Sequence, residues 1–271
     1  MKVNHFEKAL LESLRSAPLL IGDLPEAPCF DRSLVAGPPL NAELNFNQKL
    51  GHLYEDALEA LLDASDQVEL LASSLQVFDP DGRTLGELDF LLHETAGGQR
   101  IHLELAVKFY LAVERDGEWQ FPGPDPRDNW QRKLERMRSH QFVLSQTPAA
   151  KMLLRERFGI ESFAVRQLIY GCLFYPMSSE ARPLPEAVAA DCRIGRWLYV
   201  SEWENYFPDV EFVLIVPKPM WPVEIGETLK THLETISIDE LKALAQERCT
   251  LFVRLNSKEP IFLVPDDWLK I

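Results

Sequence analysis

The sequence predicts an α/β fold in which helices and strands alternate along the chain. Three observations support this prediction. Residues 50–62 place leucine and alanine on one side at helical spacing. Residues 85–92 and 101–110 alternate apolar and polar side chains, which is typical of half-buried strands. Residues 127–145 and 164–175 then follow as a further helix and an apolar strand, so the central part of the chain is ordered helix, three strands, helix, strand.

The composition indicates a globular protein with a large core. The chain has 271 residues, of which 46% are hydrophobic, and it lacks the run of about 18 apolar residues that a membrane helix needs. Its N-terminus leads into a short amphipathic segment rather than a secretory signal, so we expect a cytoplasmic protein with no membrane partner. The net charge of −14 opposes nonspecific attraction to nucleic acid. Any nucleic-acid site must therefore be a local basic patch.

Residues 1–47 are predicted to form an N-terminal helix followed by a segment that wraps the main body. Apolar residues from Asn4 to Arg15 lie near helical spacing, and Pro18 ends this pattern. Between Pro18 and Asn45, repeated prolines favour an extended path over the surface.

The first helix of the main body carries a single apolar stripe. The stripe consists of Leu50, Leu53, Tyr54, Ala57, Leu58, Leu61 and Leu62. Asn45 or Asn47 is expected to open the helix as its N-cap residue. Glu55 lies at the edge of the stripe, where its carboxylate either faces solvent or points along the sheet towards a site. A strand from Val68 to Phe78 follows and ends in the turn residues 79–82.

The next two strands are predicted to form a hairpin with one polar face. Gly97-Gly98 lies between them and can adopt the positive φ values that a tight hairpin requires. The polar faces of the two strands carry Glu87, Asp89, His102, Glu104 and Lys108. Because strand side chains alternate, Asp89, Glu104 and Lys108 are expected to project from one surface of two neighbouring strands.

The helix predicted from about Arg127 to Ser145 is the most basic segment of this acidic chain. Its basic residues are Arg127, Arg132, Lys133, Arg136 and Arg138. They form either a solvated face balanced by Asp128 and Glu135 or a patch that contacts phosphate. Its buried side is supplied, at a less regular spacing, by Trp130, Leu134, Met137, Phe142 and Leu144.

Residues 177–271 are predicted to form a C-terminal α+β extension of the core at 48–176. The expected elements are short strands near Trp197–Val200 and Phe212–Val216, a helix begun by the capping box Ser237-Ile-Asp-Glu240, and a terminal hairpin over residues 250–264.

The order of elements, together with Gly86-Glu-Leu-Asp89, Glu104 and Lys108, resembles the PD-(D/E)XK nuclease superfamily over about half of the chain. The resemblance looks closest to a bacterial branch of domains of unknown function. It implies a restriction-endonuclease-like mixed sheet flanked by helices. It also implies that Asp89 and Glu104 ligate a divalent metal and that Lys108 orients or activates the attacking water. Glu55 resembles the carboxylate often found on the first core helix of that superfamily.

The implied chemistry is metal-dependent cleavage of DNA or RNA. Carboxylate oxygens suit Mg²⁺ or Mn²⁺, which polarise phosphate and lower the pKa of bound water. A lysine ammonium stabilises the negative charge that develops at the phosphate. The residues expected to support the metal ligands or to contact the substrate are Glu87, His102, Arg132, Lys133, Arg136 and Gln141.

The chain departs from the superfamily pattern in the spacing of its lysine. The usual acidic-x-Lys motif is replaced by Glu104-Leu-Ala-Val-Lys108, a shift of two residues. Strand parity keeps Lys108 on the face of Glu104 but moves it about 7 Å along the strand. If Ala106 occupies the usual acidic position, Glu104 is a relocated ligand or the site has decayed. Gln141 is a loose substitute for the Gln-x-x-x-Tyr pattern of some relatives.

Three interpretations of this polar face stay open. The first is a metal-dependent nuclease or nuclease-like phosphodiesterase. The second is a non-catalytic module that keeps a nuclease-like fold and binds a protein partner. In the third, Asp89, Glu104 and Lys108 form a salt-bridged polar strip with a purely structural role.

Overall fold

The computed structural model describes residues 5–35, 37, 42–160 and 162–269. Its helices are α1 (His5–Ser16), α2 (Leu50–Asp63), α3 (Trp130–Arg136), α4 (Pro148–Phe158), α5 (Trp203–Tyr206), α6 (Glu227–Lys230) and α7 (Ile238–Glu247). Its strands are β1 (Val68–Phe78), β2 (Thr84–Glu94), β3 (Arg100–Leu111), β4 (Val113–Arg115), β5 (Glu118–Gln120), β6 (Ala164–Pro176), β7 (Ile194–Tyr199), β8 (Phe212–Ile215), β9 (Glu234–Ser237), β10 (Thr250–Arg254) and β11 (Ile261–Val264).

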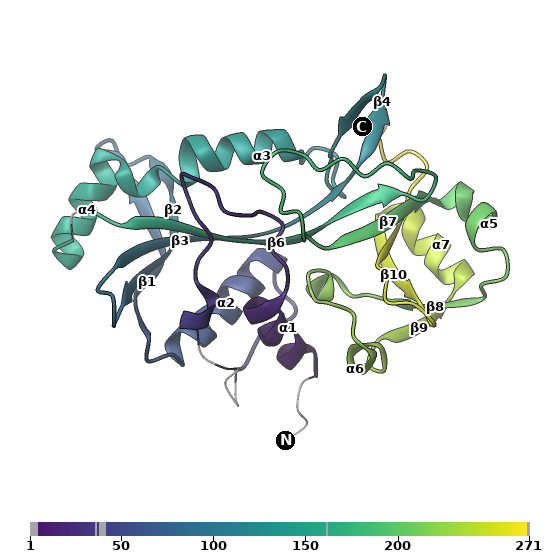
Figure 1. The fold of residues 1–271 in the computed structure, drawn as a ribbon, viewed down its shortest axis with the longest axis horizontal. Coiled ribbons are helices and arrows are strands. Elements are labelled where there is room, and N and C mark those ends of the chain that lie inside the picture. Colours follow the sequence, from purple (N-terminus) through teal and green to yellow (C-terminus); the bar gives the residue numbers. More distant parts are fainter. Residues whose placement is uncertain (1–4, 36, 38–41, 161, 270–271) are drawn as a thin grey trace.

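One large mixed sheet organises the molecule. Among the described residues it contains nine strands, in the order β1-β2-β3-β6-β7-β11-β10-β8-β9. β1, β2 and β3 pair antiparallel with one another, whereas the pairs β3–β6, β6–β7 and β7–β11 are parallel. Helices α1 and α2 lie on one face of this sheet and α3 lies on the other (Figure 1). The predicted mixed sheet flanked by helices is therefore confirmed.

The apolar stripe over residues 50–62 forms α2 and packs into the main core against β1 and β3. The predicted N-cap is wrong. The helix begins after Lys49, whose side chain makes no capping hydrogen bond. The Asn45 side chain instead accepts a hydrogen bond from the backbone nitrogen of Asn47. This local turn uses the side-chain oxygen of Asn45 as a hydrogen-bond acceptor before the helix starts, so Asn45 does not cap the helix.

The segment after α1 covers an open edge of β6. β7 pairs with β6 only over Leu173–Pro176, and no other strand of the described residues pairs with the earlier part of that edge. The backbone nitrogens of Leu20 and Phe30 donate to the carbonyls of Ile169 and Gln167, respectively, and so occupy this edge. The predicted wrapping path is thus present here. The parts of these predictions that concern residues 1–4, 36 and 38–41 lie outside the described residues.

The polar hairpin forms as β2 and β3, paired from Phe90↔Leu103 to His93↔Arg100. Of the two glycines in its turn, Gly98 adopts a positive φ of 69°. Gly97 does not, so the prediction of positive φ values for both is only half right.

The helix predicted from Arg127 to Ser145 is wrong in extent. α3 ends at Arg136 and continues as a π-helical turn over Met137–Gln141. The backbone nitrogen of Phe142 bonds to the carbonyl of Met137 at 2.8 Å, a separation of five residues. Both of these side chains are buried, and an α-helical spacing would not bury residues five apart on one side.

The residues predicted as a C-terminal extension supply β7 to β11 to the same sheet. The capping box is confirmed, because the Ser237 side chain accepts from the Glu240 nitrogen at the start of α7. The terminal hairpin is confirmed as β10 and β11, which pair antiparallel. No helix in the described ranges is long and apolar enough to span a membrane.

Candidate functional site

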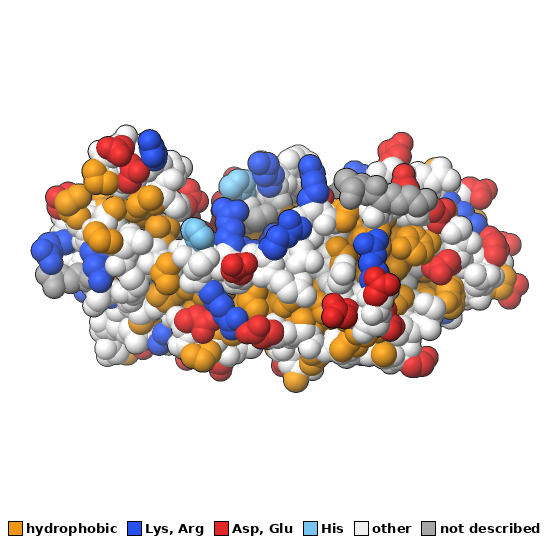
Figure 2. Space-filling model, turned by 90° about the horizontal axis from the view of Figure 1, so that it is seen from above, with side chains coloured by type: hydrophobic (Ala, Val, Ile, Leu, Met, Phe, Trp, Pro, Cys, Tyr) orange, Lys and Arg blue, Asp and Glu red, His pale blue; other side chains and the backbone are white. Residues whose placement is uncertain are grey.

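A polar pocket of about 650 Å³, which we call the α3 pocket, lies between α3 and β2. The residues that line it are Leu85, Gly86, Glu87, Asp89, Lys108, Arg127, Asp128, Asn129, Arg132, Lys133, Arg136, His140, Gln141 and Leu144. In Figure 2, which looks down on the α3 face, Lys and Arg side chains gather in the middle of the molecule above α3. The pocket therefore contains the kind of local basic patch that an acidic chain needs in order to bind a polyanion.

Asp89 lies where β2 and β3 separate. Their register ends at Phe90↔Leu103. Just beyond this pair, the backbone nitrogen of Leu105 donates to Asp89 Oδ2 at 2.8 Å. The side chain thus replaces a missing backbone partner. Burial, and next to it the charge of Glu104, raise the pKa of Asp89 well above its usual value. A carboxylate in this environment is stabilised by an added cation.

Glu104 lies beneath the pocket and is 1% exposed. Its Oε1 lies 2.7 Å from His102 Nε2, and its Oε2 accepts from Gln141 Nε2 at 2.7 Å. The other ring nitrogen of His102 lies 3.1 Å from Ser145 Oγ. Each carboxylate oxygen has two lone pairs, so these contacts fix the carboxylate without using all of its acceptor capacity.

Lys133 and Gln141 meet on one side of α3 because of the π-helical turn. An α-helical turn holds about 3.6 residues and a π-helical turn about one more, so a separation of eight residues completes two turns. Lys133 Nζ donates to Gln141 Oε1 at 2.7 Å. Burial, followed by the charge of Lys108, lowers the pKa of Lys133 to about 8.

Lys108 enters the pocket from β3 but is already paired. Its Nζ donates to Asp128 Oδ2 at 2.8 Å, and the two side chains are 29% and 35% exposed. Backbone hydrogen bonds from Gly123 to Asp128 and from Asp128 to Asp125 hold the loop that carries this carboxylate. The two-residue shift of Lys108 relative to the usual acidic-x-Lys motif therefore places its ammonium beside the carboxylate of Asp128 in this loop.

The structure brings most of the predicted site residues to this pocket. Those that line it are Glu87, Asp89, Lys108, Arg132, Lys133, Arg136 and Gln141. Glu104 and His102 are buried below it. Glu55 does not line it: this residue is on α2, which packs on the opposite face of the sheet, and its carboxylate lies 3.0 Å from His52 Nδ1. Its charge still contributes to raising the pKa of Asp89.

Sequence reasoning missed Asp128, Ser145 and His140 as members of this site. Asp128 was assigned only to balancing the basic helix. Its loop follows the proline-rich stretch and is positioned by backbone contacts that no local pattern encodes. The spacing of five between Met137 and Phe142 was a usable signal for the π-helical turn, which places His140 and Gln141.

The donor set of the pocket is compatible with a hard divalent cation. Asp89 on the pocket wall and Glu104 buried below it supply carboxylate oxygens, and burial followed by the charge of Glu104 raises the pKa of Asp89, a cost that a cation would relieve. No group of three or more His, Cys, Asp and Glu side chains is arranged to hold a metal ion among the described residues. Mg²⁺ commonly takes one or two protein carboxylates and completes its shell with water and substrate phosphate.

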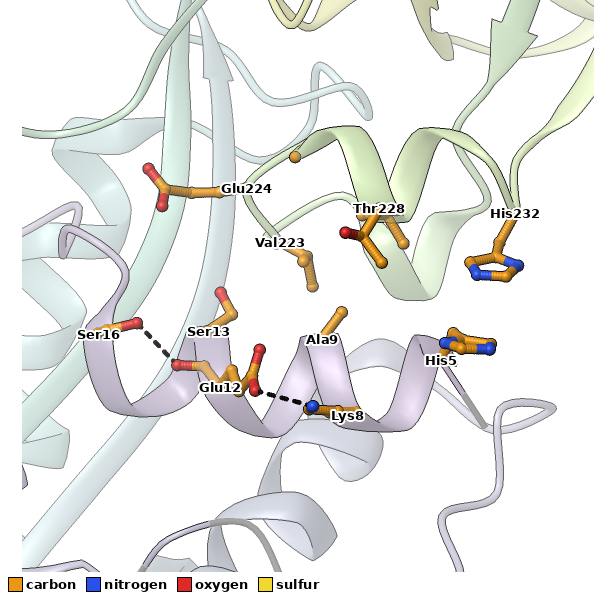
Figure 3. Close-up of a pocket in the computed structure, with 12 residues that line it drawn as sticks. His5, Lys8, Ala9, Glu12, Ser13, Ser16, Val223, Glu224, Thr228 and His232 are labelled. Atoms are coloured by element: carbon orange, nitrogen blue, oxygen red, sulfur yellow. Dashed lines mark hydrogen bonds and ion pairs between the residues drawn. The ribbon is translucent and has the colours of Figure 1, made fainter. Parts of the chain in front are cut away.

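A second cavity, of about 510 Å³, lies on the opposite side of the sheet between α1 and α6. Figure 3 shows the rings of His5 and His232 facing each other across its end, with centroids 3.9 Å apart. Lys8 and Glu12 form an ion pair at 3.8 Å along its rim. Ser13 Oγ is buried here without a hydrogen-bond partner among the described residues. This cavity combines few charges of mixed sign and lacks the basic cluster of the α3 pocket.

Comparison with known proteins identifies the family of the chain. No curated protein and no solved structure matches it. A family model described as "Domain of unknown function (DUF1853)" matches residues 26–260, which is most of the chain. The expected relation to a domain-of-unknown-function family holds at this level. The chain belongs to the DUF1853 family.

Proposed function

We propose that this protein is a metal-dependent, nuclease-like phosphodiesterase that acts on nucleic acid in the α3 pocket. The observation that carries the proposal is the proximity of Asp89 and Glu104 on adjacent strands beside a cluster of Lys and Arg side chains. Two neighbouring carboxylates favour a divalent cation, and the surrounding cations favour phosphate. Metal-dependent phosphodiester hydrolysis requires both.

The order of elements supports a restriction-endonuclease-like core. Helix α2 precedes the antiparallel strands β1, β2 and β3, and α3 precedes β6, which runs parallel to β3. This is the order that the resemblance implies, with the small β4–β5 hairpin and α4 inserted. Asp89 on β2 and Glu104 on β3 stand at the corresponding strands.

The side chains of the pocket divide the proposed reaction between them. Asp89 and Glu104 would hold Mg²⁺ or Mn²⁺, which would supply Lewis-acid activation of the phosphate and of a bound water. The contacts from Leu105, His102 and Gln141 orient the two carboxylates. An ammonium from a lysine of the pocket and the rim arginines Arg132 and Arg136 would bind phosphate oxygens. We assign the electrostatic steering of substrate to this patch, because the chain as a whole is acidic.

The test combines metal binding with cleavage. Wild type should bind Mg²⁺ or Mn²⁺ in calorimetry and cleave at least one of four substrates: single- or double-stranded DNA or RNA. Asp89→Asn and Glu104→Gln keep the shape of the side chains but remove one charge each, so each should lose metal binding and lower cleavage by about 100-fold or more. Cleavage that is equal in wild type and both variants would indicate a contaminating nuclease and would refute the proposal.

A second candidate is a non-catalytic module that uses the same surface to bind a protein partner. The observation in its favour is that Glu104 already accepts hydrogen bonds on both oxygens and that Lys108 is paired with Asp128. This candidate expects no heat of Mg²⁺ or Mn²⁺ binding that depends on Asp89 or Glu104. The same calorimetry therefore separates the two candidates.

A further inference from the structure

Two lysines reach the α3 pocket, and they differ in the groups that hold their ammonium ions. We infer that Lys133, rather than Lys108, supplies the ammonium that contacts the substrate phosphate next to the metal-binding carboxylates. This inference rests on the proposed function and specifies which cation of the pocket performs the role that the superfamily resemblance gives to a strand lysine.

The contact of Lys108 neutralises its charge. Its ammonium is 2.8 Å from the carboxylate of Asp128, and the loop that carries this carboxylate is held by backbone hydrogen bonds. A phosphate that bound Lys108 would either share its ammonium with the Asp128 carboxylate or break this ion pair, and in both cases the anionic Asp128 would lie beside the substrate. Like charges at such a distance oppose binding.

The contact of Lys133 leaves its charge available. Its ammonium donates to the amide oxygen of Gln141, which is neutral. Among the described residues, Lys133 takes part in no ion pair within 4.0 Å. The side chain is half-buried, so an uncompensated charge there is costly and a phosphate oxygen would repay part of that cost. Burial, followed by the charge of Lys108, lowers the pKa of Lys133 to about 8, so its ammonium is destabilised in the free protein, and the charges of Glu104, Asp128 and Asp89 offset this only in part.

Gln141 also fixes where that ammonium lies relative to the metal site. Its amide nitrogen donates to Glu104 and its amide oxygen accepts from Lys133, so a single planar group joins the two. The π-helical turn places Gln141 on the same side of the helix as Lys133, where it also reaches Glu104 on β3. Gln141 is therefore a positioning residue for Lys133.

The experiment measures how binding of a short fluorescent DNA oligonucleotide, single-stranded or duplex, depends on salt. It is done without divalent cations, so that binding is observed without cleavage. Each phosphate contact made by a Lys or Arg contributes about one unit to the slope of log K against log salt. Lys133→Met should lower this slope by about 1 and weaken binding about tenfold at low salt. Lys133→Arg should restore the slope, because it restores the charge.

Two further variants serve as comparisons. The double variant Lys108→Met with Asp128→Asn removes the ion pair as a neutral unit and should change the slope less than Lys133→Met does. Lys151→Met removes an exposed lysine on α4, outside the pocket, and should behave as wild type. Circular dichroism of each variant checks that the fold is retained.

A labelling experiment gives an independent readout. Lys133 should be acetylated readily near pH 8, because its lowered pKa of about 8 leaves a large fraction of its amine neutral there. Bound oligonucleotide should protect Lys133 in wild type and in the Lys108→Met, Asp128→Asn variant. A slope that falls only in the Lys108 variant, with Lys133 unprotected, overturns the inference and leaves the proposed function standing. Absence of oligonucleotide binding by wild type at low salt overturns both.

Discussion

Asp89 connects the backbone of the sheet with the chemistry of the pocket. Its Oδ2 takes the hydrogen bond of the Leu105 nitrogen at the point where β2 leaves β3. The same carboxylate is forced close to Glu104, and burial together with that charge raises its pKa. The Asp89 side chain thus provides the hydrogen-bond acceptor for the Leu105 nitrogen, but its ionised form is destabilised by burial and by the charge of Glu104. Such a combination is common where a side chain serves a function.

The cost at Asp89 leads to a prediction about stability. A raised carboxyl pKa means that the folded protein binds more protons than the unfolded chain between the two pKa values, so stability falls as pH rises through that window. Asp89→Asn keeps the acceptor for Leu105 and removes the charge. Without divalent cations, the variant should melt about 2–4 °C higher than wild type at pH 8, as about 1 kcal/mol produces in a chain of this size.

The difference should shrink at pH 4, where the carboxyl group of the wild type is protonated. Scanning calorimetry at the two pH values measures it. A variant that melts below the wild type at both pH values would show that the charge of Asp89 stabilises the fold, contrary to this reasoning.

At the residue scale, strand alternation was sufficient to predict the shared face of Asp89, Glu104 and Lys108. Whether two residues of a strand share a face depends only on whether their separation is even or odd, which can be read from the sequence. The partner of Lys108 was not predictable in the same way. Asp128 reaches it from a loop whose path is set by tertiary hydrogen bonds, and no spacing in the sequence encodes that approach.

At the element scale, the π-helical turn after α3 is the feature that assembles the pocket. Trp130, Leu134 and Met137 follow helical spacing, and Phe142 then comes five residues later. The chain buries all of them by widening one turn, which brings Gln141 beneath Lys133 and beside Glu104. The sequence predicted a helix here but not its π-helical turn, because the apolar residues follow α-helical spacing up to Met137 and a single irregular step of five residues does not by itself indicate a widened turn.

This role of the turn predicts a loss of stability on substitution of Gln141. Gln141→Leu removes the donor to the buried Glu104 and the acceptor for Lys133. Leaving buried polar groups unsatisfied costs about 1–3 kcal/mol, so the urea midpoint should fall while the slope of the transition stays the same. Gln131→Leu on α3, where the side chain is exposed, is the matched control. Equal midpoints for the two variants would show that the amide bridge contributes nothing to the fold.

At the scale of the whole molecule, the sheet joins segments that the sequence presents as separate units. Local patterns indicated most of the strands, but strand order depends on pairing between distant residues, which those patterns do not contain. β6 pairs with β7 at Leu173–Pro176, across the predicted boundary at 176. Phe174 lies against Phe262 with ring centroids 4.6 Å apart, and Trp197 Nε1 donates to the Ala112 carbonyl.

These shared contacts predict that the chain unfolds as one cooperative unit. A fragment of residues 1–176 would expose an edge of β6 and the core faces of Phe174 and Ala112, so it should aggregate or remain unfolded when expressed alone. Full-length protein should show a single thermal transition whose calorimetric and van't Hoff enthalpies agree. Two separated transitions, together with a soluble and structured 1–176 fragment, would instead establish an independent core and extension. In that case the α3 pocket would have to be complete without β7 to β11, and the fragment should keep the oligonucleotide binding of the full chain.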